Sequence, residues 1–416
     1  MRRTPAKVIV LAIAIFFILW LRRPDALLNA QFWAEDGSIF FRERVLIGFW
    51  GTIFRTYGGY SHLIPRIIAE VACLSPVRWM PLAFNLSALV IQSTACSAFF
   101  WPCYRKIISS DSLRSVCCLA VAATIPAGQE MMAAVCNLQW YLAVFSVLLL
   151  VAAGKEIWLT IIQVCIALTA PVTLLLTPML LWQLKNNEGR LKLRPGIHLL
   201  ALFIQASVMR QAAMEPKPPL HFNSLFVATL SGGLSRCVLS PLIGTGFLTE
   251  GWDVALVARL ALALLGGAVL VTLLALKSYG SPQMKWLLSA LYVGVGSLLA
   301  ALWGRNLEPN FLTMDGVRHS QGERYFLVGA CMFIFCLALA LEMLIRWPKP
   351  GVSAVVLAAI LALGTTRNFA VKPFVDLEWK KNAARIEEWE AKKAAPLVVP
   401  INPNMTFTLD STTGAF

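Results

Sequence analysis

The stretch from Val8 to Leu21 reads VIVLAIAIFFILWL and contains no charged residue. Met1-Arg2-Arg3 stands before it, and Arg22-Arg23-Pro24 follows it without the small residues of a signal-peptidase site. A secretory signal peptide has a positive start and an apolar core but also needs that cleavage site. The pattern therefore predicts an uncleaved first transmembrane helix.

The composition of the whole chain agrees with a membrane protein. Of the 416 residues, 58% are hydrophobic and only 14% are charged, whereas soluble domains are roughly one quarter charged. This excludes an ordinary water-soluble enzyme. The net charge of +14 comes mostly from basic residues in short segments between apolar runs. That placement orients a polytopic membrane protein, so nucleic acid is not an expected partner.

Apolar runs of spanning length recur along the chain. They lie near residues 6–22, 79–101, 113–129, 138–154, 195–212, 253–276, 286–303, 324–345 and 350–366. The stretch 156–184 is too long for one span and contains Pro171 and Pro178. We expect two short helices that break near Thr169-Ala170-Pro171, which is permitted where the break is buried in protein. The predicted fold class is all-α, with about eleven transmembrane or half-spanning helices.

Basic residues in the short loops fall on one face of the predicted membrane domain, 1–366. They are Arg2, Arg3, Lys7, Arg105, Lys106, Arg114, Lys155, Lys185, Arg190, Lys192, Arg194, Lys277, Lys285, Arg346 and Lys349. The positive-inside tendency makes that face, and the N-terminus, cytoplasmic. The loops 23–78, 213–252 and 304–323 and the short tail 367–416 are then periplasmic. Within 38–76, aromatic residues and arginines at helical spacing predict interfacial helices with snorkelling arginines.

The acidic residues are few, and two of them, Glu35 and Asp36, follow the first helix on its outer side. A carboxylate just above the membrane suits a general base that activates a sugar hydroxyl, or a metal ligand. The alternative is an N-cap for a helix that starts near Ser38, a position where Asp is common.

Three further clusters lie at predicted outer helix ends. The first is Gly58–Arg66, where Tyr60 could bind sugar and His62 and Arg66 could face a phosphate. The second contains Asn137, Gln139 and Trp140, which with Trp33 are candidates for sugar or acceptor binding. The third contains Arg305, His319, Arg324 and Tyr325 as further phosphate ligands. Together they fit transfer from a lipid-phosphate donor, in which cations stabilise the leaving phosphate. Each has a simpler alternative, such as Arg324-Tyr325 anchoring a helix at the interface.

Several catalytic motifs are absent from the sequence. It has no P-loop, no HExxH, no GxSxG and no paired CxxC. These absences argue against an ATP-driven pump, a zinc protease and a serine hydrolase. Most of the ten cysteines lie in apolar runs, where a thiol packs as a small hydrophobe. No cofactor is expected, and a divalent metal is possible but not indicated.

The acidic pair after the first helix, the proline-broken hairpin at 156–184 and the Arg324-Tyr325 pair before a late helix resemble the GT-C class of integral-membrane glycosyltransferases. Size and topology are similar to the serotype-converting glucosyltransferases that decorate O-antigen. The resemblance implies an inverting transfer of a hexose from undecaprenyl phosphate to a periplasmic glycan, such as the O-antigen of lipopolysaccharide. It implies that Asp36, or else Glu35, is the base. It also implies a bacterial inner membrane. Members often carry a soluble C-terminal domain, where this chain has a tail.

Two other functions compete with the glycosyltransferase. A transporter or flippase of a lipid-linked saccharide would use the same outer surface without chemistry. It would need polar residues through the membrane interior, and the predicted spans are clean apart from Arg259 and a few marginal positions. A non-catalytic assembly subunit would tolerate Asp36→Asn without loss.

Overall fold

The computed structural model describes residues 4–125, 128–151, 157–212, 233, 235–245, 263, 266–267, 281–304, 322–344, 351–393 and 395–411. Most of these residues are helical, as predicted. The helices are α1 (Thr4–Arg22), α2 (Asp25–Leu28), α3 (Arg42–Thr52), α4 (Leu63–Ala72), α5 (Met80–Ser97), α6 (Asp111–Thr124), α7 (Leu138–Val151), α8 (Ile157–Ala167), α9 (Thr177–Asn186), α10 (Leu193–Ala212), α12 (Ser240–Ile243), α15 (Pro282–Gly304), α17 (Leu327–Leu344), α18 (Val352–Asn368) and α19 (Trp379–Lys392). The predicted span at 253–276, apart from residues 263, 266 and 267, lies outside the described residues.

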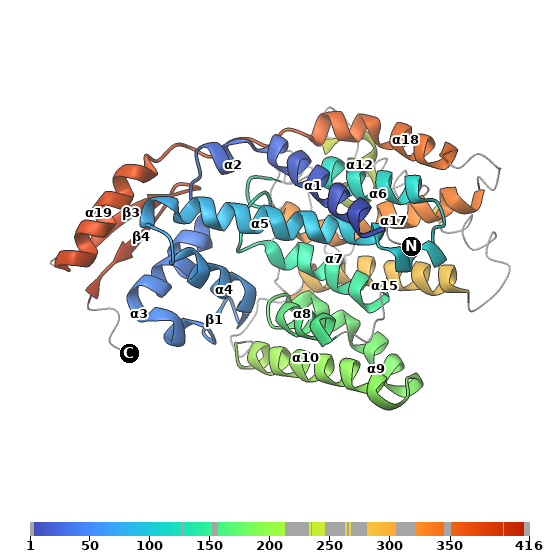
Figure 1. Ribbon diagram of the computed structural model, residues 1–416, viewed down its shortest axis with the longest axis horizontal. Helices are drawn as coiled ribbons and strands as arrows, with labels where there is room; N and C mark the ends of the chain where they lie inside the picture. The colour runs from blue at the N-terminus through green and yellow to red at the C-terminus, as the bar shows by residue number, and fades with distance from the viewer. Residues whose placement is uncertain are drawn as a thin grey trace.

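Helix α17 lies in the middle of the bundle (Figure 1). It packs against α6, α7, α15 and α18, and most of its side chains are buried. Helix α1 instead packs on α5 and α6 from outside and exposes apolar side chains such as Ile9, Val10 and Phe17. An apolar helix that is exposed on one side suits contact with lipid rather than water.

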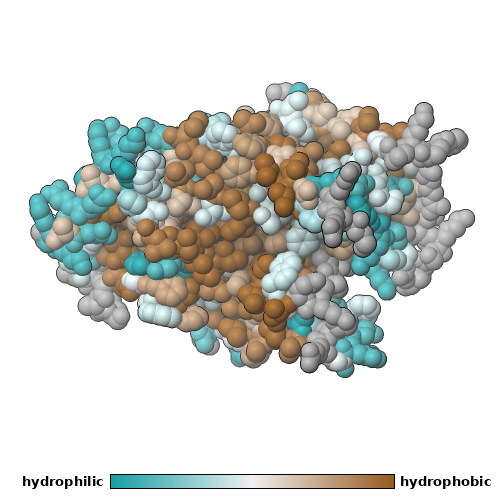
Figure 2. Space-filling model, viewed as in Figure 1, coloured by the Kyte–Doolittle hydropathy of each residue, from teal (hydrophilic) through white to brown (hydrophobic). Residues whose placement is uncertain are grey.

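Three helical segments in the described part of the chain are long and apolar enough to cross a membrane. They are Pro5–Arg22, Val77–Lys106 and Leu327–Leu344. Shorter apolar helices cover Leu138–Leu150, Ile157–Ala167 and Val352–Asn368. Apolar side chains cover the middle of the face in Figure 2, and hydrophilic residues gather toward both ends of the long axis. These features indicate association with a membrane. The count of about eleven crossings stays a prediction.

The break predicted in 156–184 is present. Helix α8 ends at Ala167, a 3-10 turn covers Pro171–Leu176, and α9 follows. The predicted first outer loop, residues 23–78, satisfies groups at the break, because the N–H of Leu63 donates to the Leu168 carbonyl and the N–H of Ile64 donates to Thr169 Oγ1. The broken helix end therefore also fixes the start of α4.

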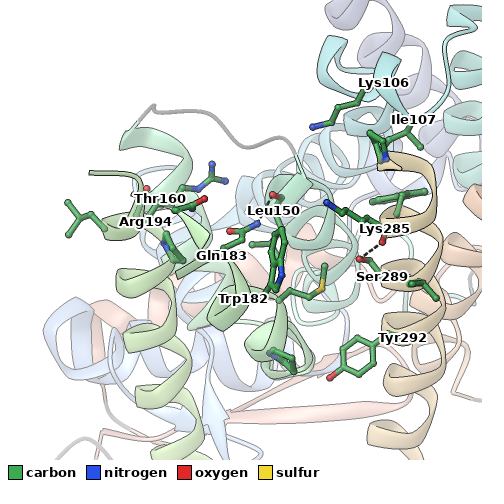
Figure 3. Close-up of a pocket in the computed structure, with 18 of the residues that line it drawn as sticks. Lys106, Ile107, Leu150, Thr160, Trp182, Gln183, Arg194, Lys285, Ser289 and Tyr292 are labelled. Carbon is green, nitrogen blue, oxygen red and sulfur yellow. Dashed lines mark hydrogen bonds between the residues drawn. The ribbon is translucent and has the colours of Figure 1, made fainter. Parts of the chain in front are cut away.

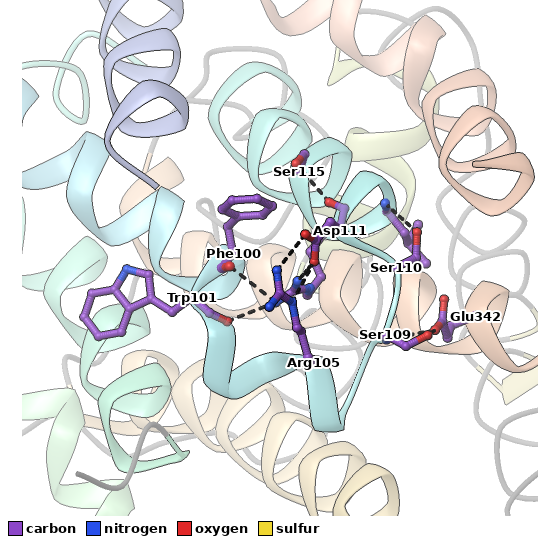
Figure 4. Close-up of polar contacts among 10 residues, drawn as sticks. Phe100, Trp101, Arg105, Ser109, Ser110, Asp111, Ser115 and Glu342 are labelled. Atoms are coloured by element: carbon purple, nitrogen blue, oxygen red, sulfur yellow. Dashed lines mark hydrogen bonds and ion pairs between the residues drawn. The ribbon is translucent and has the colours of Figure 1, made fainter. Parts of the chain in front are cut away.

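Charge pairs shape the connection between α5 and α6 (Figure 4). This connection lies at the end of the bundle where the chain begins (Figure 1). The Ser110 hydroxyl caps the N-terminus of α6. Asp111 in the next position pairs with Arg105, at 2.8 Å, and with the buried Arg114. Arg114 also donates to the Trp101 carbonyl. Two of the basic residues that predicted a cytoplasmic face are thus paired with one carboxylate.

Three arginines of the first outer loop pair with carboxylates of the same loop. Arg44 binds Glu70, and Arg66 binds Glu43 at 2.8 Å, with Arg55 3.6 Å from the same carboxylate. The helices predicted in 38–76 are present as α3 and α4. Of the four arginines for which snorkelling into headgroups was predicted, Arg44, Arg55 and Arg66 form ion pairs within the loop, and Arg42 donates to the Thr408 carbonyl.

Two short antiparallel hairpins depart from the predicted all-α fold. Strands β1 (Thr56–Tyr57) and β2 (Tyr60–Ser61) join through Gly58-Gly59, both of which have positive φ. Paired glycines in a two-residue loop are typical of a hairpin turn. Strands β3 (Leu397–Ile401) and β4 (Met405–Leu409) form the second hairpin, in the predicted tail.

The C-terminal segment packs directly on the first outer loop. The Trp379 ring contacts the Phe32 ring edge-on at 4.9 Å, and the Trp379 indole N–H donates to the Val77 carbonyl. Asn402 pairs with the loop backbone, because its carbonyl accepts the N–H of Ala34 at 2.6 Å. Residues 373–409 are therefore part of the structure that positions the residues around position 36.

Candidate functional site

Asp36 is buried within the first outer loop, shortly before α3 begins. It begins a π-helical turn, Asp36–Phe41, after Ala34 with a positive φ of 32°. The side chain does not cap that helix. Its two oxygens instead accept the backbone N–H groups of Val135, at 2.9 Å, and Cys136, at 2.7 Å. The N-cap alternative is therefore wrong, because the carboxylate binds a different segment.

Burial controls the proton affinity of Asp36. Removal from water raises the pKa of its carboxyl to about 7, although the hydrogen bonds from Val135 and Cys136 act in the opposite direction. The neighbouring Glu35 carboxylate adds a smaller upward effect. A carboxylate with a pKa near neutrality is suited to general base catalysis at physiological pH. Glu35 itself is half-buried, and no hydrogen bond or ion pair joins it to another described residue.

The segment from Glu130 to Asn137 connects Asp36 to a second charged group. At one end its N–H groups bind Asp36. At the other end the Glu130 carboxylate binds the Arg324 guanidinium at 2.5 Å. Asn137 supports the segment internally, because its side-chain amide donates to the Glu130 carbonyl at 2.9 Å. The predicted base and one predicted phosphate ligand are thus held by the same eight residues.

Arg324 retains access to solvent, with about 31% of its side chain exposed. Its guanidinium donates to the Tyr325 hydroxyl at 3.3 Å and lies 5.0 Å from the centre of that ring. The Tyr325 ring meets Trp140 edge-on at 5.3 Å. Three residues predicted for donor and sugar binding, Trp140, Arg324 and Tyr325, therefore lie together. Gln139, also predicted for sugar or acceptor binding, is buried.

A second, fully buried pair lies next to this cluster. Arg236 stands 4.0 Å from Glu323, and its guanidinium lies over the Phe326 ring. Burial raises the pKa of Glu323 to about 7, against the effect of Arg236. The sequence analysis missed Arg236. A signal was available, because Arg236 is the single charged residue in a run that includes Val238 and Leu239. An isolated charge among apolar residues needs a partner.

His62 and Arg66, the phosphate ligands predicted in the first outer loop, are buried among residues of that loop. Arg66 is buried and forms an ion pair with Glu43. The His62 ring packs against Phe40 and Tyr60 and contacts the Tyr57 carbonyl at 3.0 Å. The structure brings Tyr60, His62 and Arg66 into one cluster around the Phe40 ring.

The remaining predicted site residues are Trp33, Arg305 and His319. Trp33 stacks on Phe374 at 4.9 Å, so it contacts the C-terminal segment. Arg305 and His319, like Arg259, lie outside the described residues. Within the described ranges, no group of three His, Cys, Asp or Glu side chains could hold a metal ion.

No family model matches the chain, and neither the curated proteins nor the solved structures contain a significant match to it.

Proposed function

We propose that this chain is a membrane-embedded glycosyltransferase that moves a hexose from a polyprenyl-phosphate donor to a glycan acceptor outside the bacterial cytoplasmic membrane. The proposal includes the predicted eleven crossings, with the N-terminus inside and the C-terminus outside. The observation that carries it is the buried Asp36 carboxylate, with a pKa of about 7, held by the segment whose other end binds Arg324.

The proposed reaction is an inverting displacement, as the resemblance implies. Asp36 takes the proton of an acceptor hydroxyl as that oxygen bonds to the anomeric carbon. The bond from this carbon to the phosphate oxygen breaks, and polyprenyl phosphate leaves with the bonding electrons. Arg324 stabilises the charge that develops on the phosphate. The Glu130 carboxylate, which binds Arg324, then competes with the donor phosphate for the same guanidinium.

Reconstitution tests this function directly. The full chain in vesicles, supplied with a polyprenyl-phosphate hexose and a lipid-linked glycan, should give an acceptor that is one hexose heavier. An equal amount of free polyprenyl phosphate should appear. A folded protein that binds the donor yet gives no product would contradict the proposal.

A second candidate is a transporter of lipid-linked saccharides, favoured by one observation. A large cavity with cationic side chains lies between α8, α9, α10 and α15, and Asp36 is not among the residues that line it. The same vesicles separate the two functions, because a transporter would move a fluorescent lipid-linked saccharide between leaflets without changing its mass.

A further inference from the structure

The cavity lies between α8, α9, α10 and α15 and measures about 1470 Å³ (Figure 3). Pockets for small molecules are usually roughly 300–1,000 Å³, so this one has room for a larger ligand. Helices α9 and α15 place it toward the end of the bundle where α1 begins (Figure 1). It shares no residue with the cluster around Asp36 and Arg324. What it binds is therefore a question separate from the proposed function.

The lining carries a surplus of positive charge. Lys106, Arg194 and Lys285 contribute three cations, and Glu188 contributes one carboxylate. Lys106 and Lys285 are exposed and lie at the same end of the cavity in Figure 3. The side chain of Gln283 holds their segments together by donating to the Lys106 carbonyl at 2.9 Å. This end of the cavity suits a negatively charged group.

The polarity of the side chains that line the cavity changes along α15. Lys285, Ser289 and Tyr292 are four and three residues apart, so they share one face of the helix. From Lys285 to Tyr292 the helix rises by roughly 10 Å. Over that distance the lining passes from an ammonium group to a hydroxyl and then to an aromatic ring. Trp182 faces this stretch from α9, with its ring 5.5 Å from the Lys285 ammonium.

Apolar side chains also surround the mouth of the cavity. Trp182, Leu193 and Leu288 line it and are each about half exposed. In a chain with membrane-spanning helices, such residues face hydrocarbon rather than water. A ligand that enters here would come from the bilayer with its charged end toward the lysines.

We propose that this cavity binds a phospholipid with an anionic headgroup from the leaflet at the basic end of the molecule. The phosphate lies between Lys106 and Lys285, and one chain runs along α15 past Ser289 and Tyr292. Basic pockets between membrane helices recognise headgroups in this way. Phospholipids are the occupant because they are the bulk component of the bilayer to which the mouth opens.

Native mass spectrometry of the full chain in detergent, with phosphatidylglycerol and phosphatidylcholine at equal concentration, tests the site. The wild type should retain one phosphatidylglycerol in preference to phosphatidylcholine. Lys106→Glu with Lys285→Glu should lower that bound fraction at least about tenfold, because each cation near an anionic lipid contributes to its attraction. Ser289→Trp fills the channel without changing charge and should lower it as well.

The matched control is Lys7→Glu with Lys185→Glu. These two lysines are exposed on the same predicted face but do not line the cavity, so this variant should bind phosphatidylglycerol like the wild type. Equal binding of the two lipids, or equal loss in both double variants, would overturn the proposal. Preference for undecaprenyl phosphate over phosphatidylglycerol would also overturn it and would favour the transporter. Asp36→Asn should leave lipid retention unchanged, which separates this inference from the glycosyltransferase proposal.

Discussion

Asp36 accepts a hydrogen bond of 2.7 Å from the backbone N–H of Cys136, across 100 positions of sequence. This bond and its neighbour from Val135 join the first outer loop to the segment before α7. The carboxylate therefore has a structural partner as well as a proposed catalytic task. A variant at Asp36 must be tested for both, since an amide would place an N–H against a backbone N–H and would cost about 1–3 kcal/mol.

The pH dependence of transfer should reveal Asp36. A base works in its deprotonated form, and burial raises the pKa of Asp36 to about 7. We expect kcat/KM to rise as the pH increases through about 7 and to level off above it. Glu323 has a raised pKa of the same value, so Glu323→Gln is the matched control. If the rise disappears in Glu323→Gln, the titrating group is not Asp36.

Arg324→Ala should weaken donor binding. A charge-assisted bond to phosphate contributes about 1.5–3 kcal/mol, so the donor Kd should rise about ten- to hundredfold. Glu130→Gln should do the opposite, because it removes the carboxylate that competes for Arg324. Equilibrium binding of a fluorescent donor lipid measures both. Arg55→Ala changes an exposed arginine of the outer loop and should leave the Kd unaltered; an unchanged Kd in Arg324→Ala would return Arg324 to helix anchoring.

The proposed orientation can be tested by labelling. Met405 is exposed in β4, and Lys185 is exposed at the end of α9. All ten native cysteines are buried or half-buried. In a background with those cysteines replaced, Met405→Cys should react with a membrane-impermeant reagent in intact spheroplasts. Lys185→Cys should react only after lysis. The reverse pattern would show that the chain is inserted the other way round.

The C-terminal segment should contribute to stability through Trp379. This ring is buried against Phe32, and its loss should cost about 3–5 kcal/mol, as for other buried large-to-small changes. Thermal unfolding in detergent should show a much lower midpoint for Trp379→Ala. Trp50 is 83% exposed, so Trp50→Ala should change the midpoint little. Equal midpoints for the two variants would mean that the segment does not stabilise the protein.

The sequence predicted the helices well because each depends on local information. The apolar run 8–21 became α1, and the prolines near 171 predicted the break between α8 and α9. Three segments are long and apolar enough to span, although the predicted total was about eleven. Other described apolar helices, Leu138–Leu150, Ile157–Ala167 and Val352–Asn368, are shorter, and the predicted span 253–276 lies almost entirely outside the described residues.

The partners of charged residues could not be predicted in the same way. A cation such as Arg66 attracts either a ligand phosphate or a carboxylate of its own loop, and the sequence does not decide between them. In the folded chain the partner of Arg66 is the Glu43 carboxylate. For Arg324 the predicted neighbours Tyr325 and Trp140 are present, but Glu130 as its direct partner follows from packing between distant segments.

The mass of the surface glycan repeat in host cells tests the central claim most directly. The cells would carry the wild type, Asp36→Asn, Glu35→Gln or no protein, with membrane abundance of each variant matched. We predict an increment of one hexose with the wild type and with Glu35→Gln, and none with Asp36→Asn or without the protein. The same increment in cells carrying Asp36→Asn would contradict the role of Asp36, and identical glycans in all four would contradict the transferase itself.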